Sequence, residues 1–184
     1  MSLSLLLSRT LSRSLSRLAP TRCVMLAGAA ALLLGGCANP WQQFQAGAPQ
    51  SALVAKLGPP KEVYALPDGN TRLLWPTRPY GETTTAAVVN PSGVTVSIEQ
   101  ALTAQNFEQA QVGTWTQHDV QIRFGLPEET AYYPLMKRSV WSYRFMEDNY
   151  WYMLYHFYFD DAGVLRMTQK MVDPLHDPEA RDSL

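Results

Sequence analysis

The chain has 184 residues, of which 46% are hydrophobic and 17% charged, and its 15 basic and 16 acidic residues give a net charge of −1. No acidic residue precedes Glu62, so a chain cut after residue 36 keeps 11 basic and all 16 acidic residues, a net charge of −5. That length suffices for one ordinary domain or two very small ones, and the charge excludes a basic stripe for nucleic acid or anionic lipid headgroups.

Residues 1–36 have the pattern of a bacterial lipoprotein signal peptide. Four arginines form a basic region, and Val24–Leu34 forms an apolar run of eleven residues. This run is about half of the roughly 20 residues that a helix needs to span a bilayer. Small residues then stand directly before a cysteine in Leu34-Gly35-Gly36-Cys37. The pattern predicts cleavage after Gly36 and a covalent lipid on the thiol of Cys37.

Two other interpretations of this leader stay open. The stretch Leu7–Arg17 is rich in arginine and serine and free of acids, which is also typical of a mitochondrial transit peptide. Such a peptide does not need an apolar run that ends in Gly-Gly-Cys. Alternatively, the leader is an ordinary secretory signal in which Cys37 is incidental.

A lipidated Cys37 has consequences for location and stability. Cleavage removes Cys23, the other cysteine, so the mature chain has no intramolecular disulfide. Ala38 follows the lipidated residue where an aspartate favours retention in the inner membrane, so we expect the outer membrane, with the domain in the periplasm. The tether, residues 37–40, holds the domain about 10 Å from its anchor, which predicts a partner at the membrane surface.

After the tether, one order of landmarks occurs twice. The two Gly-x-Pro elements lie 67 positions apart and the two Arg-x-x-Trp elements 66. The first pass contains Phe44, Leu53, Leu57-Gly58-Pro59-Pro60, Arg72–Trp75 and Asn90–Val94. The second contains Phe107, Val120, Phe124-Gly125-Leu126-Pro127, Arg138–Trp141 and Asp160–Val164. The shared order predicts two copies of one unit, residues 41–102 and 103–172.

In the first copy, short helices are predicted around Trp41–Ala46 and from Pro49 to Leu57, where Gly58-Pro59-Pro60 ends the second. Strands are predicted around Arg72–Trp75, over Thr83–Val89 and over Val94–Glu99. In the last of these, Val94, Val96 and Ile98 alternate with polar residues, which indicates a half-buried strand.

In the second copy, a short helix is predicted over Ala104–Ala110. The next helix begins at Thr116, with Asp119 three residues on, and ends at Gly125. Strands follow over Val140–Phe145, Tyr150–Phe159 and Leu165–Met171, with Asp160–Gly163 as a hairpin loop. We therefore expect an α+β fold of two helix-helix-strand-strand-strand repeats, with short helices on antiparallel three-stranded sheets. Residues 173–184 are predicted to be a mobile tail.

The repeat resembles the SmpA/OmlA/BamE-like family of outer-membrane lipoproteins. The resemblance covers nearly all of residues 40–172. It rests on Cys37, the two Gly-x-Pro helix ends, Trp75 and Trp141 at the opening of each sheet, and the Gly163-Val164 hairpin. Two units in tandem are also similar in arrangement to the β-lactamase-inhibitor proteins, which bind enzymes with their sheet surface. Both likenesses imply a binding protein without catalytic residues.

The residues themselves offer little for catalysis. His118, His156 and His176 are the only histidines, and they lie far apart in the sequence. A metal site or a nucleophilic triad needs such groups together with acids or a thiol. We therefore expect no enzyme activity, no catalytic or metal-binding residues, no small-molecule substrate and no cofactor, apart from the lipid on Cys37.

The segment Tyr150–Phe159 has more aromatic residues than a half-exposed strand needs. One set of alternating side chains, from Trp151 to Phe159, can face the helices. The candidate partner-binding residues are on the opposite set: Tyr150, Tyr152, His156 and Tyr158. Large exposed aromatic patches commonly mark protein interfaces. The alternative is that the other copy, or a loop, covers this face.

We expect an outer-membrane lipoprotein that acts as a non-enzymatic protein-binding module in envelope or outer-membrane protein assembly. Its expected partner is an outer-membrane or membrane-surface protein, and nucleic acid is not expected. The alternative is an inhibitor-type module that binds a periplasmic or secreted hydrolase.

Overall fold

The computed structural model describes residues 39–79 and 81–176. The predicted signal peptide, its cleavage site after Gly36 and the lipidation residue Cys37 lie outside these residues. Within the described part of the chain, no helix has the length and apolarity needed to cross a membrane.

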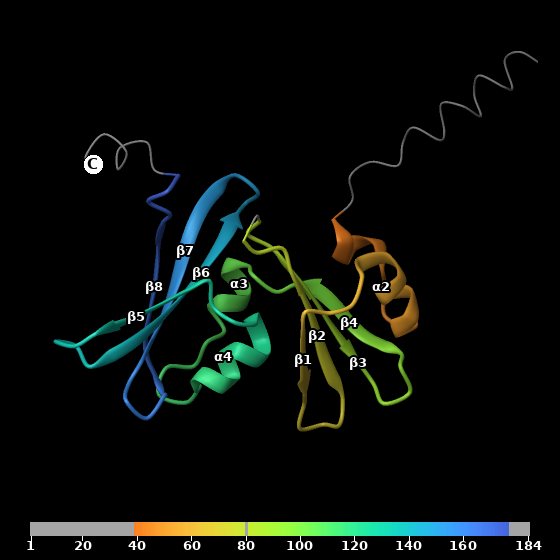
Figure 1. Cartoon of the computed structure of the whole chain (residues 1–184), viewed down its shortest axis with the longest axis horizontal. Coiled ribbons are helices and arrows are strands. Elements are labelled where there is room, and N and C mark those ends of the chain that lie inside the picture. Colours follow the sequence, from red (N-terminus) through yellow and green to blue (C-terminus); the bar gives the residue numbers. More distant parts are fainter. Residues whose placement is uncertain (1–38, 80, 177–184) are drawn as a thin grey trace, which may run out of the picture. The chain divides into compact units, whose positions relative to one another are not determined.

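The described chain forms four short helical segments and eight strands, most of which are labelled in Figure 1. The first half contains the 3₁₀ helix η1 (Pro40–Gln43), α2 (Gln50–Leu57), β1 (Glu62–Ala65), β2 (Thr71–Pro76), β3 (Thr84–Val89) and β4 (Thr95–Gln100). The second half contains α3 (Ala104–Phe107), α4 (Gln117–Phe124), β5 (Glu129–Tyr133), β6 (Arg138–Glu147), β7 (Trp151–Phe159) and β8 (Leu165–Val172).

The predicted fold of two helix-helix-strand-strand-strand repeats on three-stranded sheets is wrong. The structure is β-rich, with few short helices and two four-stranded antiparallel sheets in the orders β1-β2-β3-β4 and β5-β6-β7-β8. The strands that sequence reasoning missed are β1 and β5, the first edge strand of each sheet. They have four and five residues, and every residue of β5 is exposed. Such strands form through backbone pairing. They lack the alternation of buried apolar and exposed polar side chains from which a strand is predicted in a sequence.

The helices are short because local signals start and stop them. At the start of α4, the Thr116 hydroxyl accepts a hydrogen bond from the Asp119 backbone, and the Asp119 carboxylate accepts one from the Thr116 backbone. This capping box confirms the predicted start. Gly58 and Gly125, with φ of 79° and 84°, follow α2 and α4 and take a conformation that other residues rarely adopt. The predicted helices at 41–46 and 104–110 are shorter, at 40–43 and 104–107.

In each sheet, an aromatic side chain of the second strand donates a hydrogen bond to the backbone carbonyl of the glycine that ends the preceding helix, α2 or α4. The indole of Trp75 donates to the Gly58 carbonyl at 2.9 Å, and the hydroxyl of Tyr143 donates to the Gly125 carbonyl at 2.8 Å. The sequence comparison paired Trp75 with Trp141, but Tyr143 makes the corresponding contact in the second half. Trp141 instead packs edge-on against Phe159.

The first sheet is buried on both faces. Leu73, Trp75, Ala87 and Val89 pack with Leu53 of α2 in one cluster. The neighbouring side chains Leu74 and Ala86 belong to the larger cluster, which includes Phe107 and Phe124 of the second-half helices and the inner residues of β6 and β7. The contacts therefore define the layers α2, first sheet, α3 with α4, and second sheet. Burial on both faces explains the consecutive apolar residues in β2 and β3.

The predicted buried face of β4 is right at Ile98, which packs against the α2 cluster, but wrong at Val94 and Val96. Val94 and Val96 are 36% and 49% exposed, whereas Thr95 is 2% exposed. The register of β3 with β4 shifts between Val88 and Val89, and the Thr95 backbone also pairs with residues 47 and 48. Because side chains alternate along a strand, such an irregularity changes which residues face the core.

Candidate protein-binding site

The second sheet has an inner and an outer face, which its register defines. Tyr143, Phe145 and Phe157 point to the inner face and pack against Phe107, and Phe159 packs against Phe157 in the same large cluster. The outer face consists of the alternating residues Glu129, Ala131, Tyr133, Arg138, Val140, Ser142, Arg144, Met146, Tyr152, Leu154, His156, Tyr158, Met167, Gln169 and Met171. This face contains three of the four predicted binding residues.

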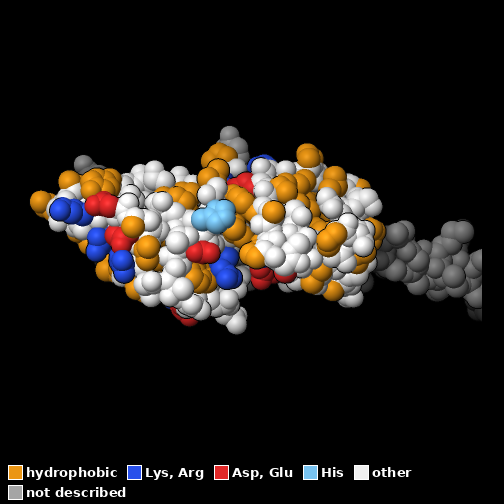
Figure 2. Space-filling view, turned by 90° about the horizontal axis from the view of Figure 1, so that it is seen from below, with side chains coloured by type: hydrophobic (Ala, Val, Ile, Leu, Met, Phe, Trp, Pro, Cys, Tyr) orange, Lys and Arg blue, Asp and Glu red, His pale blue; other side chains and the backbone are white. Residues whose placement is uncertain are grey.

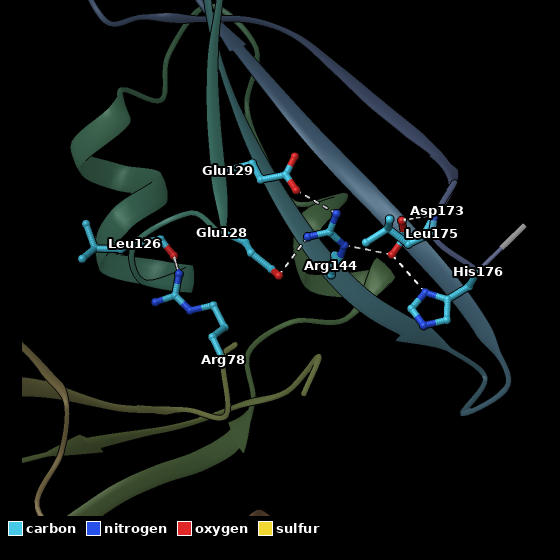
Figure 3. A network of polar contacts seen from close by, with 8 residues as sticks. All are labelled: Arg78, Leu126, Glu128, Glu129, Arg144, Asp173, Leu175 and His176. Atoms are coloured by element: carbon cyan, nitrogen blue, oxygen red, sulfur yellow. Dashed lines mark hydrogen bonds and ion pairs between the residues drawn. The ribbon is translucent and has the colours of Figure 1, made fainter. Parts of the chain in front are cut away.

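Arg144 organises the middle of the outer face (Figure 3). Its guanidinium donates to Glu128, Glu129 and Asp173 at 2.8, 2.8 and 2.9 Å. Burial alone would lower the pKa of Arg144, but the carboxylates of Glu129 and Glu128 raise it overall. The network joins the segment before β5, β6 and the segment after β8, so it fixes the positions of three separate stretches of chain.

The chain continues past β8 onto the outer face. Asp173 is 1% exposed and accepts from Arg144, the Leu175 backbone and the ring of His176. The His176 ring in turn stacks on Tyr152, with 3.8 Å between the ring centroids. In the tail predicted to begin at Asp173, the Asp173 and His176 side chains contact the sheet, and residues 177–184 lie outside the described part of the chain.

The predicted binding residues differ in their exposure. Tyr150 is 71% exposed and lies in the turn between β6 and β7, while Tyr152, His156 and Tyr158 are half-buried. Part of their cover comes from His176, which stacks on Tyr152, and from neighbouring outer-face side chains. Leu154, on the same face, is only 6% exposed. The outer face is therefore a packed aromatic surface with an exposed end at Tyr150.

His156 and Tyr158 are held in place by hydrogen bonds. The Nδ1 atom of His156 lies 2.8 Å from the Ser142 hydroxyl, and the Tyr158 hydroxyl donates to Gln169 at 2.7 Å. Burial lowers the pKa of His156, although the Glu129 carboxylate opposes this. Burial, with a smaller contribution from Tyr133, raises the pKa of Tyr158. At neutral pH both side chains are therefore uncharged, which suits contact with an apolar partner surface.

Exposed large hydrophobic side chains gather in the second half of the chain. Of the 15 such residues among those described, 11 lie between Leu126 and Leu175. Trp151, expected to face the helices, is instead 57% exposed and packs edge-on against Tyr150 with 4.9 Å between centroids. A space-filling view from below shows hydrophobic side chains beside charged ones towards the end formed by β5 and β6 (Figure 2).

Sequence reasoning missed the β5–β6 hairpin as a surface feature. Tyr132, Tyr133 and Met136 are about half exposed, at 55%, 49% and 49%, and Leu135 is 101% exposed. Backbone hydrogen bonds from Met136 to Tyr133 and from Lys137 to Pro134 hold the turn. The signal was present in the sequence as Tyr-Tyr-Pro-Leu-Met, an apolar run around a proline outside the predicted strands.

A separate cleft of about 680 Å³ lies between the β1–β2 turn and α4. Leu66, Asp68, Arg72, His118 and Arg123 contribute to its walls. The two halves of the chain meet at this cleft, since the Arg72 side chain of the first half donates to the Arg123 carbonyl of the second half at 2.9 Å. Arg72 also donates to Glu99 of its own half at 2.9 Å. The charged residues of the cleft mostly serve such internal contacts, including the stacking of Arg123 over Trp115 at 4.2 Å.

The three histidines lie on α4, on β7 and after β8. Within residues 39–79 and 81–176, no group of three or more histidine, cysteine, aspartate or glutamate side chains is placed to hold a metal ion.

Comparison with known proteins gave no matching family model, no matching curated protein and no matching solved structure.

Proposed function

We propose that the chain is an outer-membrane lipoprotein that acts as a non-enzymatic protein-binding module in envelope or outer-membrane protein assembly. The leader supports the location, because its basic region, short apolar run and Leu34-Gly35-Gly36-Cys37 end fit a lipoprotein signal. The resemblance of the repeat to the SmpA/OmlA/BamE-like family supports a binding role. The lipid on Cys37 would be a permanent anchor, since two or more acyl chains bind membranes stably.

The observation that carries the binding role is the concentration of exposed hydrophobic side chains between Leu126 and Leu175. Tyr150 and Trp151 form its most exposed aromatic pair. Aromatic residues of this kind are enriched among the few side chains that supply most of the binding energy at protein interfaces. The Arg144 network and the stacking of His176 on Tyr152 hold the adjacent outer face rigid, which lowers the entropy cost of binding.

A photo-crosslinking experiment in intact cells tests the proposal. A photoreactive amino acid is placed at Tyr150 and, as a matched control, at Val112, which is 54% exposed on a different segment. We expect Tyr150 to capture an outer-membrane or membrane-surface protein that Val112 does not capture. Capture of a soluble hydrolase would favour the inhibitor-type module instead, and equal yields at both positions would contradict the proposed binding surface.

A variant separates binding from anchoring. Changing both Tyr150 and Trp151 to serine should weaken capture of the partner at least about tenfold, because each ring supplies a large contact area. A Val112→Ser variant should leave capture unchanged. Cys37→Ser should move the protein from the membrane fraction to the soluble fraction while leaving the isolated binding reaction intact.

A further inference from the structure

The outer edge of β5 is free of backbone partners in the described chain. β5 pairs with β6 on one side only and ends the second sheet. β1, the edge of the first sheet, also pairs on one side only, but its side chains Glu62 and Tyr64 bond to Leu126 and Gln121 of the second half. The edges of β4 and β8 are covered at their first residues. Thr95 at the start of β4 bonds to residues 47 and 48, and Leu165 at the start of β8 bonds to Gly113 and Trp115. An open edge strand presents unpaired N–H and C=O groups and is a template for another strand.

Symmetry restricts how two copies of β5 can pair. In an antiparallel ladder, hydrogen-bonded and non-hydrogen-bonded residue pairs alternate along the strands. A two-fold axis must map each pair onto a pair of the same kind. The axis therefore lies between the two strands, at a position where one residue is opposite the same residue of the second copy. Centring the axis on Ala131 overlaps all five residues of Glu129–Tyr133 with their symmetry mates. Ala131 is exposed, and its small side chain allows the close approach.

This register is chemically self-complementary. Glu129 of one copy lies opposite Tyr133 of the second copy, and Thr130 lies opposite Tyr132. No like charges face each other, and pairs of an aromatic with a β-branched residue stabilise sheets. The turn residues Leu135 and Met136 then extend past the strand, beside the residues that precede β5 in the second copy. That segment contains Leu126, which is itself 49% exposed.

We propose that β5 is a homodimer interface, in which two copies pair antiparallel about Ala131 and join their second sheets into one eight-stranded sheet. The pairing gives hydrogen-bond partners to the backbone N–H and C=O groups on the outer edge of β5. It also covers the exposed side chains of Tyr132, Leu135, Met136 and Leu126. It places the outer faces of both sheets on the same side, because residues opposite each other in an antiparallel pair share a face. The interface uses the β5–β6 part of the exposed hydrophobic residues, whereas the proposed partner contacts centre on Tyr150 and Trp151, so each can be tested by its own variants.

Disulfide trapping tests the register. The full chain with Cys23→Ser and Cys37→Ser is purified in detergent, and a cysteine is introduced at Ala131 or, as the control, at Thr130. Two cysteines at position 131 would face each other with Cβ atoms roughly 4.5–5.5 Å apart, close to the spacing of a disulfide. A cysteine at 130 would face Tyr132. We expect a covalent dimer with Ala131→Cys and at least a tenfold lower yield with Thr130→Cys.

Equal yields from the two cysteines, or none from either, would overturn the proposal. Sedimentation of the uncrosslinked chain gives a second measure. Leu135→Asp should raise the dimer dissociation constant at least tenfold, because it places a charge in the apolar contact, whereas Val112→Asp should leave it unchanged. A chain that stays monomeric at every concentration contradicts the interface. Circular dichroism of each variant shows whether the fold is retained.

Discussion

At the scale of single residues, Asp173 and Arg144 show how the outer face is fixed. Asp173 is almost fully buried, and its side chain has one cationic guanidinium beside it, from Arg144. Burying a charge is costly unless another charge and hydrogen bonds compensate for it. The Arg144 guanidinium supplies that opposite charge to Asp173. It also forms ion pairs with Glu128 and Glu129, so one guanidinium binds three carboxylates.

Arg144→Met should therefore lower the free energy of unfolding by about 3 kcal/mol, because it leaves the Asp173 carboxylate buried without its cation. Arg138→Met is the matched control, since within the described residues the Arg138 side chain donates only to the neighbouring Lys137 carbonyl, and it should cost less than about 0.5 kcal/mol. Urea denaturation of both variants measures the difference. Similar losses in the two would show that the network does not stabilise the fold.

His156 should make stability depend on pH. Its pKa in the folded chain is lowered by burial, so between that pKa and about 6.5 the unfolded chain binds more protons than the folded chain. The free energy of unfolding therefore falls as the pH drops below about 6.5. His156→Gln should reduce this slope. An NMR titration of the His156 ring with a midpoint at or above about 6.5 would contradict the argument.

At the scale of elements, the two helix-ending glycines share a backbone conformation but not an environment. A Cβ atom on Gly58 would meet nothing within 4 Å, whereas one on Gly125 would lie 2.9 Å from a carboxylate oxygen of Glu62. That carboxylate accepts hydrogen bonds from the Arg78 guanidinium, the Tyr64 hydroxyl and the Leu126 backbone N–H. Figure 3 also shows Arg78 reaching the Leu126 carbonyl, so Gly125 lies where β1 and the segment between β2 and β3 contact the end of α4.

Gly58→Ala and Gly125→Ala consequently make a matched pair. Both introduce a side chain at positive φ with ψ near 180°, a region that essentially only glycine occupies, which costs about 1–3 kcal/mol. Gly125→Ala should cost a further roughly 1–3 kcal/mol, because the Glu62 carboxylate must move and lose hydrogen bonds. Thermal or chemical unfolding of the two variants gives the comparison. Equal losses would mean that the Glu62 contacts adjust without cost.

At the scale of the whole molecule, the large core cluster contains residues of both halves. Leu74 of β2 and Ala86 of β3 pack in it with Phe107, Phe124 and residues of β6 and β7. The second sheet thus relies on the first for part of its core. A structure built in this way should unfold in one transition, because neither half keeps its apolar contacts when the other is lost.

Leu74→Ala should lower the stability of both halves by about 2–5 kcal/mol. Fluorescence of single-tryptophan variants that retain Trp75 or Trp141 reports on each sheet separately. We expect the two probes to give coincident unfolding curves before and after the substitution. A shift in the Trp75 curve alone would mean that the halves fold independently.

Sequence reasoning succeeded where neighbours in the chain decide the structure. The start of α4 at Thr116 and the glycines that end α2 and α4 were predicted from local hydrogen bonding and backbone freedom. The hairpin loops at Asn90–Gly93 and Asp160–Gly163 are also local. In each, the first side chain accepts two backbone hydrogen bonds, and the glycine has a φ near 75°.

For the candidate site, the sequence identified the aromatic strand but not how far each ring is exposed. Trp151 was predicted to face the helices, but it is the first residue of β7 and is 57% exposed. The covering of Tyr152 by His176 depends on residues 24 positions apart, and no periodicity indicates it.

The sequence by itself determined the turns, the helix ends and the residues of the aromatic strand, because each depends on interactions between close neighbours in the chain. Only the tertiary structure decided that each sheet has a fourth strand, that the first sheet is buried on both faces, and that the chain after β8 folds onto the outer face. Edge strands join a sheet through backbone hydrogen bonds, and every residue type except proline has both the N–H donor and the C=O acceptor. The side chains therefore do not specify this pairing, which depends on which strands the packed elements bring together.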